Sequence, residues 1–281
     1  MKVQFLRRRK LGNGSTLGIV QYLQEYGVDN VEVIRNDRAS TDAPIVVRWG
    51  CTTNTGASHI INSSRGIHTV NTKDAFRKVL QDNGVSVPYS YFSKRGIQES
   101  PHVVFPLIGR PAHHAQGRNA VVCHSVADVM RDATSAYWST IIQKEREFRV
   151  YCFFGKVIAV AEKVPDDVTQ LLWNRAQGHS TFNNVRWTDW PINAVKEALK
   201  VHMLSNCDFE GVDVMTKGST AYILESNSAP SLTTEYRKQC FAKAFASVIK
   251  TIRETGQKPA HATVNMGATS YREFIHPAIH S

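Results

Sequence analysis

The chain has 281 residues, of which 42% are hydrophobic and 21% are charged, a balance typical of soluble globular proteins rather than disordered or fibrous ones. No apolar run is long enough to cross a bilayer, and the first ten residues lack the apolar core of a signal peptide, so a cytoplasmic location without a membrane partner is expected. The five cysteines are widely separated and include no Cys-x-x-Cys pair, which favours reduced thiols over disulfides or a zinc site.

A net charge of +10 indicates an anionic partner or substrate, and nucleotides, acidic peptides and nucleic acid all fit that description. The basic cluster at residues 7–10 could grip phosphates, although a short run of this kind is more often a solvated loop. Charge alone does not choose among these partners.

Residues 1–70 are predicted to form a small α/β domain. A helix at residues 16–26 has Ser15 as a good N-cap and Gly27 as a good C-cap. Short apolar runs predict strands at residues 3–6, 31–34 and 45–47.

A second block, residues 71–256, begins with a helix whose cap is expected at Asn71 and Thr72. Lys73 then lies in the first turn, where a cation opposes the positive end of the helix dipole. An anionic ligand would remove this mismatch, and a freely solvated lysine would tolerate it.

The rest of this block divides into two predicted lobes. Residues 101–143 read as a small α+β lobe, too short to be stable alone, and residues 144–256 as a larger lobe that carries the candidate metal site. The stretch 173–190 is predicted to be irregular, and residues 257–281 to form a loose or partner-binding tail.

The most informative segment runs from residue 209 to 230 and reads as a hairpin bearing Asp213, Glu225 and Asn227. Side-chain alternation places Glu225 and Asn227 on one face, together with Ala221 and Ile223. Asp213 shares that face only if the hairpin loop has an odd number of residues, and a two-residue Lys-Gly turn would separate them. Carboxylate and amide oxygens suit Mg²⁺ (or Mn²⁺) bound with ATP phosphates, whereas the alternative is a hairpin with an ordinary wet face.

Taken in order, these segments resemble the ATP-grasp superfamily, most of all the ribosomal-protein glutamate ligases and ATP-grasp proteins of bacteriophages. The strongest element is Gly-Val-Asp213 followed by Leu-Glu225-Ser-Asn227-Ser-Ala-Pro230, and the resemblance covers residues 71–232. It implies an α/β fold with α+β lobes, namely an ATP-grasp core preceded by a small α/β domain. It also implies that Asp213, Glu225 and Asn227 hold magnesium ions that bridge the ATP phosphates.

The resemblance assigns further residues to ATP. Lys73 and Arg110 would contact the nucleotide, and Gln116, Gly117 and Arg118 fall in a loop that would close over the phosphates. Gln143, Lys144 and Glu145 occupy the hinge that would read the adenine edge, and Arg149 and Lys163 would face the γ-phosphate. Asn183 or Asn184 would lie on the substrate side.

Three positions depart from the family pattern. Arg110 replaces a lysine, the hinge is shortened, and the segment after Pro230 lacks the usual glycine. A planar guanidinium keeps the charge of the replaced lysine but changes the contact geometry.

The family reading predicts a ligase that joins a carboxylate to an amine through an acyl phosphate. The sequence does not specify the two substrates or the oligomeric state, and acidic proteins, peptides and nucleic acid are all candidate substrates. Arg48 is a candidate carboxylate-binding residue, with simple packing as its alternative role. One rival is a nucleic-acid-binding protein that uses Trp173, Trp187 and Trp190. Another is an ATP-grasp scaffold that binds nucleotide without ligation.

Overall fold

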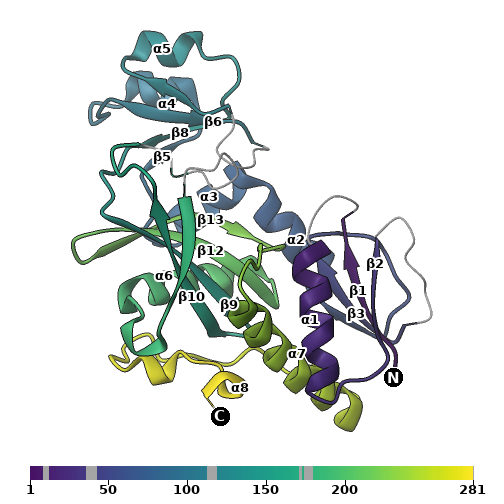
Figure 1. Ribbon diagram of the computed structural model, residues 1–281. Helices are drawn as coiled ribbons and strands as arrows, with labels where there is room; N and C mark the ends of the chain where they lie inside the picture. Colours follow the sequence, from purple (N-terminus) through teal and green to yellow (C-terminus); the bar gives the residue numbers. More distant parts are fainter. Residues whose placement is uncertain (9–12, 36–42, 113–118, 171–172, 174–179, 281) are drawn as a thin grey trace.

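The N-terminal part of the computed structural model is a parallel sheet with helices on one side (Figure 1). The structure describes residues 1–8, 13–35, 43–112, 119–170, 173 and 180–280. The N-terminal strand order is β2-β1-β3-β4, and all pairs are parallel. The elements are β1 (Val3–Arg7), α1 (Asn13–Glu25), β2 (Val31–Arg35), β3 (Ile45–Trp49) and β4 (His59–Ile61).

Two helices lead from this domain towards the rest of the molecule. α2 (Ser64–Asn71) was not predicted, and its N-terminus is capped by the Ser63 side chain, which accepts a hydrogen bond from the Gly66 amide. The predicted helix at Lys73 is α3 (Lys73–Asp82).

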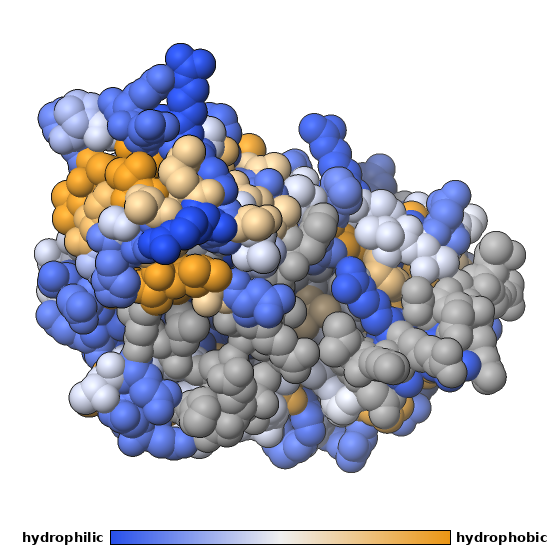
Figure 2. Space-filling model, turned by 90° about the horizontal axis from the view of Figure 1, so that it is seen from above, coloured by the Kyte–Doolittle hydropathy of each residue, from blue (hydrophilic) through white to orange (hydrophobic). Residues whose placement is uncertain are grey.

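The small lobe, residues 90–140, is a four-stranded antiparallel sheet of order β5-β8-β6-β7 with two short helices. Its elements are β5 (Ser90–Tyr91), α4 (Lys94–Glu99), β6 (Leu107–Arg110), β7 (Val121–Cys123), α5 (Val126–Arg131) and β8 (Tyr137–Thr140). Five buried side chains form its core: Ile97, Leu107, Cys123, Val129 and Trp138. Seen from above, the molecule shows hydrophobic side chains gathered over the small lobe (Figure 2). Val104, which precedes β6, is 69% exposed.

The large sheet is antiparallel throughout, with the order β11-β10-β9-β12-β13. α6 covers one face, and α7 lies beside α1 on the other side (Figure 1), so that one aromatic core joins the large sheet to the N-terminal domain. Trp49 of β3 stacks on Phe209 at 4.9 Å, and Phe5 packs edge-on against Phe245 at 5.2 Å. The elements are β9 (Arg146–Phe153), β10 (Lys156–Pro165), β11 (Ser180–Val185), the 3-10 turn η3 (Trp187–Asp189), α6 (Ile192–Ser205), β12 (Phe209–Lys217), β13 (Thr220–Asn227) and α7 (Glu235–Thr255).

Two predictions about irregular segments were wrong. The stretch 173–190 contains β11, a polar edge strand whose single buried apolar side chain, Phe182, gave no periodic signal. The C-terminal segment is docked rather than loose: Phe274 is fully buried, and Val157 exchanges backbone hydrogen bonds with Phe274 and His276. The segment also contains η4 (Tyr271–Glu273) and α8 (Pro277–His280).

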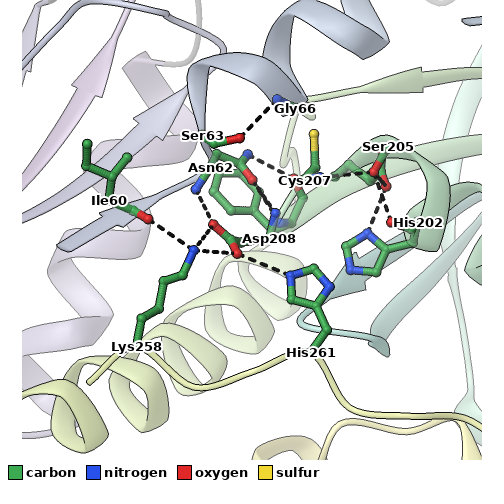
Figure 3. A network of polar contacts seen from close by, with 12 residues as sticks. Ile60, Asn62, Ser63, Gly66, His202, Ser205, Cys207, Asp208, Lys258 and His261 are labelled. Atoms are coloured by element: carbon green, nitrogen blue, oxygen red, sulfur yellow. Dashed lines mark hydrogen bonds and ion pairs between the residues drawn. The ribbon is translucent and has the colours of Figure 1, made fainter.

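Polar contacts around Asp208 fix this C-terminal segment and the N-terminal domain to β12 (Figure 3). Lys258 donates to both carboxylate oxygens of Asp208 at 2.9 Å, and His261 lies 3.2 Å from one of them. The Asn62 amide donates to the same carboxylate at 2.6 Å. These hydrogen bonds and charges outweigh burial, which alone would raise the pKa of Asp208, and the pKa is lowered.

None of the helices in the described part of the chain combines the length and the hydropathy needed to cross a bilayer.

The docked C-terminal segment predicts a pH-dependent stability. Burial lowers the pKa of His276 to about 4 from an ordinary value of 6.5. As the pH falls through this window the unfolded chain gains a proton that the folded chain does not, so the folded state should lose up to roughly 3 kcal/mol. His276→Asn retains an acceptor for the Ala278 amide and removes the titration. Denaturant unfolding of both proteins between pH 7 and pH 4 should show the extra loss in the natural protein alone, and parallel profiles would refute it.

Candidate functional site

Charged side chains from four adjacent strands share one face of the large sheet. Residues directly opposite each other in an antiparallel ladder point to the same side. The register pairs Asp213 with Arg149 on β9 and with Glu225 on β13, and it pairs Glu147 with Lys163 on β10. The sheet therefore gathers three carboxylates and two cations on one surface.

A β-bulge in β13 creates this arrangement. The hairpin turn is the two residues between Lys217 and Thr220, which are paired, so a regular ladder would place Leu224 opposite Asp213. The register instead shifts by one residue between Val214, paired with Ile223, and Asp213, paired with Glu225. An odd-numbered loop is therefore not needed, because one extra residue in the strand has the same effect.

The bulge also corrects the predicted alternation along β13. Ala221 and Ile223 are buried on the α6 side, whereas Glu225 and Asn227 are half-buried on the other face. The extra residue reverses the alternation of side chains between Ile223 and Glu225, so the first half of the strand does not share a face with the candidate metal ligands.

Asp213 is held by Arg149 in a two-pronged ion pair. The Nε–Oδ1 distance is 2.6 Å and the Nη2–Oδ2 distance is 2.7 Å. Burial alone would lower the pKa of Arg149, but the Asp213 carboxylate outweighs burial and raises the pKa above its ordinary value. The guanidinium also lies 4.8 Å from the centre of the Phe182 ring.

Glu225 lies between Asn227 and Lys73. The Asn227 side-chain amide donates to Glu225 Oε1 at 3.1 Å, and Lys73 Nζ is 3.8 Å from Oε2. Lys73 Nζ also donates to the Ser226 carbonyl at 2.5 Å, and only 11% of its side chain is exposed. The solvated-lysine alternative is therefore wrong, since an acidic neighbour compensates the unfavourable end of the helix dipole.

Glu147 holds two lysines beside this pair. Lys144 Nζ is 2.6 Å from Glu147 Oε2, Lys163 binds the other oxygen, and Glu147 is 3% exposed. Lys144 also lies 4.2 Å from the centre of the Trp173 ring. Burial lowers the pKa of Lys144, although Glu147 opposes the shift.

The small lobe meets this face across a small pocket. Arg110 of β6 is paired with Tyr137 of β8. Burial lowers the pKa of Arg77 and that of Lys144, and the positive charge of Arg110 adds a smaller contribution to both shifts. The pocket lies between α3, β8 and β13 and is lined by Lys73, Phe76, Arg77, Leu80, Tyr137, Leu224, Glu225 and Ser226.

Solved structures with a similar arrangement of sheets and helices identify the fold. The ATP-grasp ligase PsnB in complex with a minimal precursor superposes with a TM-score of 0.65 at 13% identity, covering 89% of this chain and 99% of that one. D-alanine–D-alanine ligase from Bacillus anthracis gives a TM-score of 0.64 at 13% identity over 92% and 100% of the two chains. The chain has the ATP-grasp fold.

Other ATP-grasp structures agree. A RimK-domain ATP-grasp protein from Sphaerobacter thermophilus has a TM-score of 0.62 at 11% identity over 88% and 98% of the two chains. Among these neighbours, PsnB has been solved with Mg and ADP, and the Bacillus anthracis ligase with ATP. No protein-family model matches the chain, and a search of curated protein sequences finds no significant similarity.

Several residues predicted to belong to the site either lie away from the charged face of the large sheet or already form hydrogen bonds within the protein. Gln116, Gly117 and Arg118 fall outside the described residues. In the segment predicted to be the hinge, Gln143 is exposed, whereas the Glu145 backbone amide donates to the Thr216 carbonyl at 2.8 Å and the Glu145 carboxylate accepts from the Gly218 amide at 3.1 Å. The backbone donor of Glu145 is therefore used by the hairpin.

The two candidate asparagines point to opposite faces of β11. Asn184 is opposite Ala161, which is itself opposite Arg149, so Asn184 lies on the site face. Its Oδ1 accepts from the Thr234 hydroxyl, the N-cap of α7, at 3.2 Å. Asn183 is opposite Glu162 on the other face.

Arg48 lies in the N-terminal domain at the end of β3 and is 4% exposed. It donates to the Ser64 hydroxyl at 2.7 Å and the Thr53 carbonyl at 2.9 Å, while its Nε has no partner among the described residues. Within the described part of the chain no carboxylate pairs with it, and burial lowers its pKa. A buried cation that binds only neutral oxygens is energetically incomplete.

Sequence reasoning missed Glu147 as an anchor and Arg77 altogether. Glu147 stands in the segment Glu147-Phe-Arg149, where alternation already placed it on the face of Arg149. Arg77 gave no such signal because it lies on an amphipathic helix, where a single basic residue is ordinarily exposed.

Glu147 provides a test of this charge cluster. Glu147→Gln leaves two largely buried ammonium groups with one neutral partner, so the free energy of unfolding should fall by about 2 kcal/mol. Glu162→Gln on the opposite face breaks a more exposed pair with Arg146 and should cost less than about 1 kcal/mol. Denaturant titration measures both, and equal losses would contradict the described burial.

Proposed function

We propose that the protein is an ATP- and Mg²⁺-dependent ligase that joins a carboxylate to an amine. The observation that carries this proposal is the pairing of Asp213 with Glu225 on a face that also bears Arg149 and Lys163. Metal ligands and phosphate-binding cations then stand side by side, as the transfer of a phosphoryl group requires.

The donor set fits magnesium. Asp213 and Glu225 offer carboxylate oxygens from directly opposite positions, and Asn227 adds an amide oxygen from the same strand. Mg²⁺ prefers such hard oxygen ligands and completes its shell with phosphate oxygens and water. When held by Asp213, Glu225 and Asn227, the ion would neutralise negative charge on the phosphates.

The basic residues would take the phosphates from several directions. Arg149, Lys163 and Lys144 are now balanced by Asp213 and Glu147, and a triphosphate would offer them alternative oxygens. Lys73 lies at the border with the small lobe, and Arg110 lies on it. Arg118, with Gln116 and Gly117, belongs to the loop proposed to close over the nucleotide.

The proposed reaction needs no nucleophile from the protein. The substrate carboxylate attacks the γ-phosphorus, ADP leaves, and an acyl phosphate remains. An amine then attacks the acyl carbon, phosphate leaves, and an amide is formed. All five cysteines are buried, which agrees with chemistry that relies on positioning and charge neutralisation.

A peptide carboxylate is the acid substrate that we propose first. Two neighbours, PsnB and a RiPP-associated ligase from Chryseobacterium gregarium, were solved with precursor, leader or core peptides. The net charge of +10 would attract an acidic peptide. Asn184, on the site face beside the start of α7, would contact it, and Arg48 would bind a carboxylate of the same substrate.

The nucleic-acid alternative loses its aromatic support. Trp173 and Trp190 are 5% and 4% exposed, and Trp187 packs against Tyr271 at 5.0 Å. Two of these rings are buried and the third is half-buried against Tyr271, so they do not form a continuous surface on which bases could stack.

The metal assignment predicts a specific loss. Asp213→Asn and Glu225→Gln should leave folded proteins whose ATP turnover falls by more than about a hundredfold, because phosphate charge is no longer neutralised. Turnover is followed by phosphate release in a screen of amino acids, peptides and DNA, with mass spectrometry of joined products. Glu162→Gln is the matched control. Near-normal turnover in the two variants would reject the metal site, and Mg-ATP binding without phosphate release on any substrate would favour the scaffold.

Arg48→Met tests the substrate side. Because Arg48 stands apart from the metal strands, the variant should raise the KM for the acid substrate by about tenfold or more while Mg-ADP affinity stays within about threefold. Steady-state kinetics with the substrate found in the screen, together with calorimetry of Mg-ADP, separates the two effects. An unchanged KM would assign Arg48 to packing alone.

A further inference from the structure

Arg77 of α3 holds the bulge in β13. Its Nη1 donates to the Ile223 carbonyl at 2.8 Å, and its Nη2 donates to the Leu224 carbonyl. In a regular strand successive carbonyls point to opposite edges, so one guanidinium cannot reach both. Its two contacts are therefore possible only because the bulge turns neighbouring carbonyls the same way.

The bulge would be costly without this partner. Residues at a bulge leave the ladder, and a buried carbonyl without a donor costs about 1–3 kcal/mol. β13 is an edge strand, and the Ile223 amide is already satisfied by the Ser86 carbonyl at 2.8 Å. Arg77 lies on the same outer side of β13 and donates the hydrogen bonds that the Ile223 and Leu224 carbonyls would otherwise lack.

Arg77 is buried where it makes these contacts. It is 6% exposed, and within the described chain no carboxylate forms an ion pair with it. Tyr137 of the small lobe lies beside it, and Glu225 is close enough to act on its charge. A planar fork suits two adjacent carbonyls, whereas the ammonium of a lysine would serve only one of them well.

We propose that Arg77 is a positioning residue that fixes the bulge in β13 and thereby places Glu225 opposite Asp213. The inference rests on the proposed metal site. Arg77 touches neither substrate nor metal in this scheme, and it acts through the backbone that carries one metal ligand.

The test compares metal dependence with nucleotide binding. ADP affinity is measured by calorimetry with and without Mg²⁺ for the natural protein and for Arg77→Met. We expect the gain in affinity due to Mg²⁺ to fall by about tenfold or more in the variant, while metal-free ADP affinity changes by less than about threefold. Lys78→Met, which removes an exposed cation from the next position of α3, should change neither value. Arg77→Lys should lie between, because one carbonyl keeps its donor.

Deletion of Leu224 separates positioning from a general loss of stability. It makes the Val214–Ile223 and Asp213–Glu225 pairs consecutive, so Glu225 stays opposite Asp213 in a ladder without a bulge. In that background Arg77→Met should no longer weaken the Mg²⁺ effect. An equal weakening in both backgrounds, or none in either, would overturn the proposal.

A crystal structure gives a readout that does not depend on the proposed function. In Arg77→Met we expect the register of β13 to change and the Asp213–Glu225 pair to be lost. If that variant does not fold, Arg77→Lys should show both registers, because one carbonyl keeps its donor. A bulge retained as the only register would overturn the role of Arg77. Absence of any Mg²⁺ effect in the natural protein would instead refute the proposed metal site and leave the register result to stand by itself.

Discussion

The register of a single antiparallel pair decides which charged side chains share a face of the large sheet. Asp213 and Glu225 share a face only because β13 contains one residue more than its partner between the turn and Glu225. A slip of one residue would turn Glu225 towards α6 and the apolar side of the sheet, where an unpaired carboxylate is strongly disfavoured. Arg149, Lys163 and Asn227 lie around these two carboxylates, so in the proposed site all three would act on the same metal nucleotide.

The charges on this face balance one another pairwise. Asp213 holds Arg149, Glu225 lies near Lys73, and Glu147 is shared between two lysines. A metal nucleotide could replace these pairs without leaving any charge uncompensated, since the cation would take the carboxylates while the phosphates take the basic groups. Each of these carboxylates therefore has a basic partner, whereas a face that held the carboxylates alone would be destabilised by their mutual repulsion.

Sequence reasoning reached the fold class and most of the strands, because period-two alternation and helix caps are local signals. It also placed Asp213 and Glu225 in one hairpin, but it could not locate the bulge, since a single extra residue leaves no pattern and depends on Arg77 at a distance of about 146 positions in the chain. β11 was not predicted because Phe182 is buried by side chains from other parts of the chain. The docking of the C-terminal segment was not predicted because the residues that hold it, Asp208 and Val157, are far away in the sequence. Contacts between residues far apart in the sequence were the common cause of each miss.

The N-terminal domain and the small lobe are attached to the candidate site in different ways. The aromatic core of Trp49, Phe209, Phe241 and Phe245 ties the N-terminal domain to the strand that bears Asp213, so a substrate held at Arg48 would keep its place relative to the metal. The small lobe has a separate core of five buried residues and meets the site across the pocket beside Tyr137. The small lobe is therefore joined to the candidate site through a smaller surface than the N-terminal domain is, and Arg110 lies on it. Arg77 lies at that boundary, in contact with the bulge and beside Tyr137, so one side chain connects the small lobe with the strand that bears Glu225.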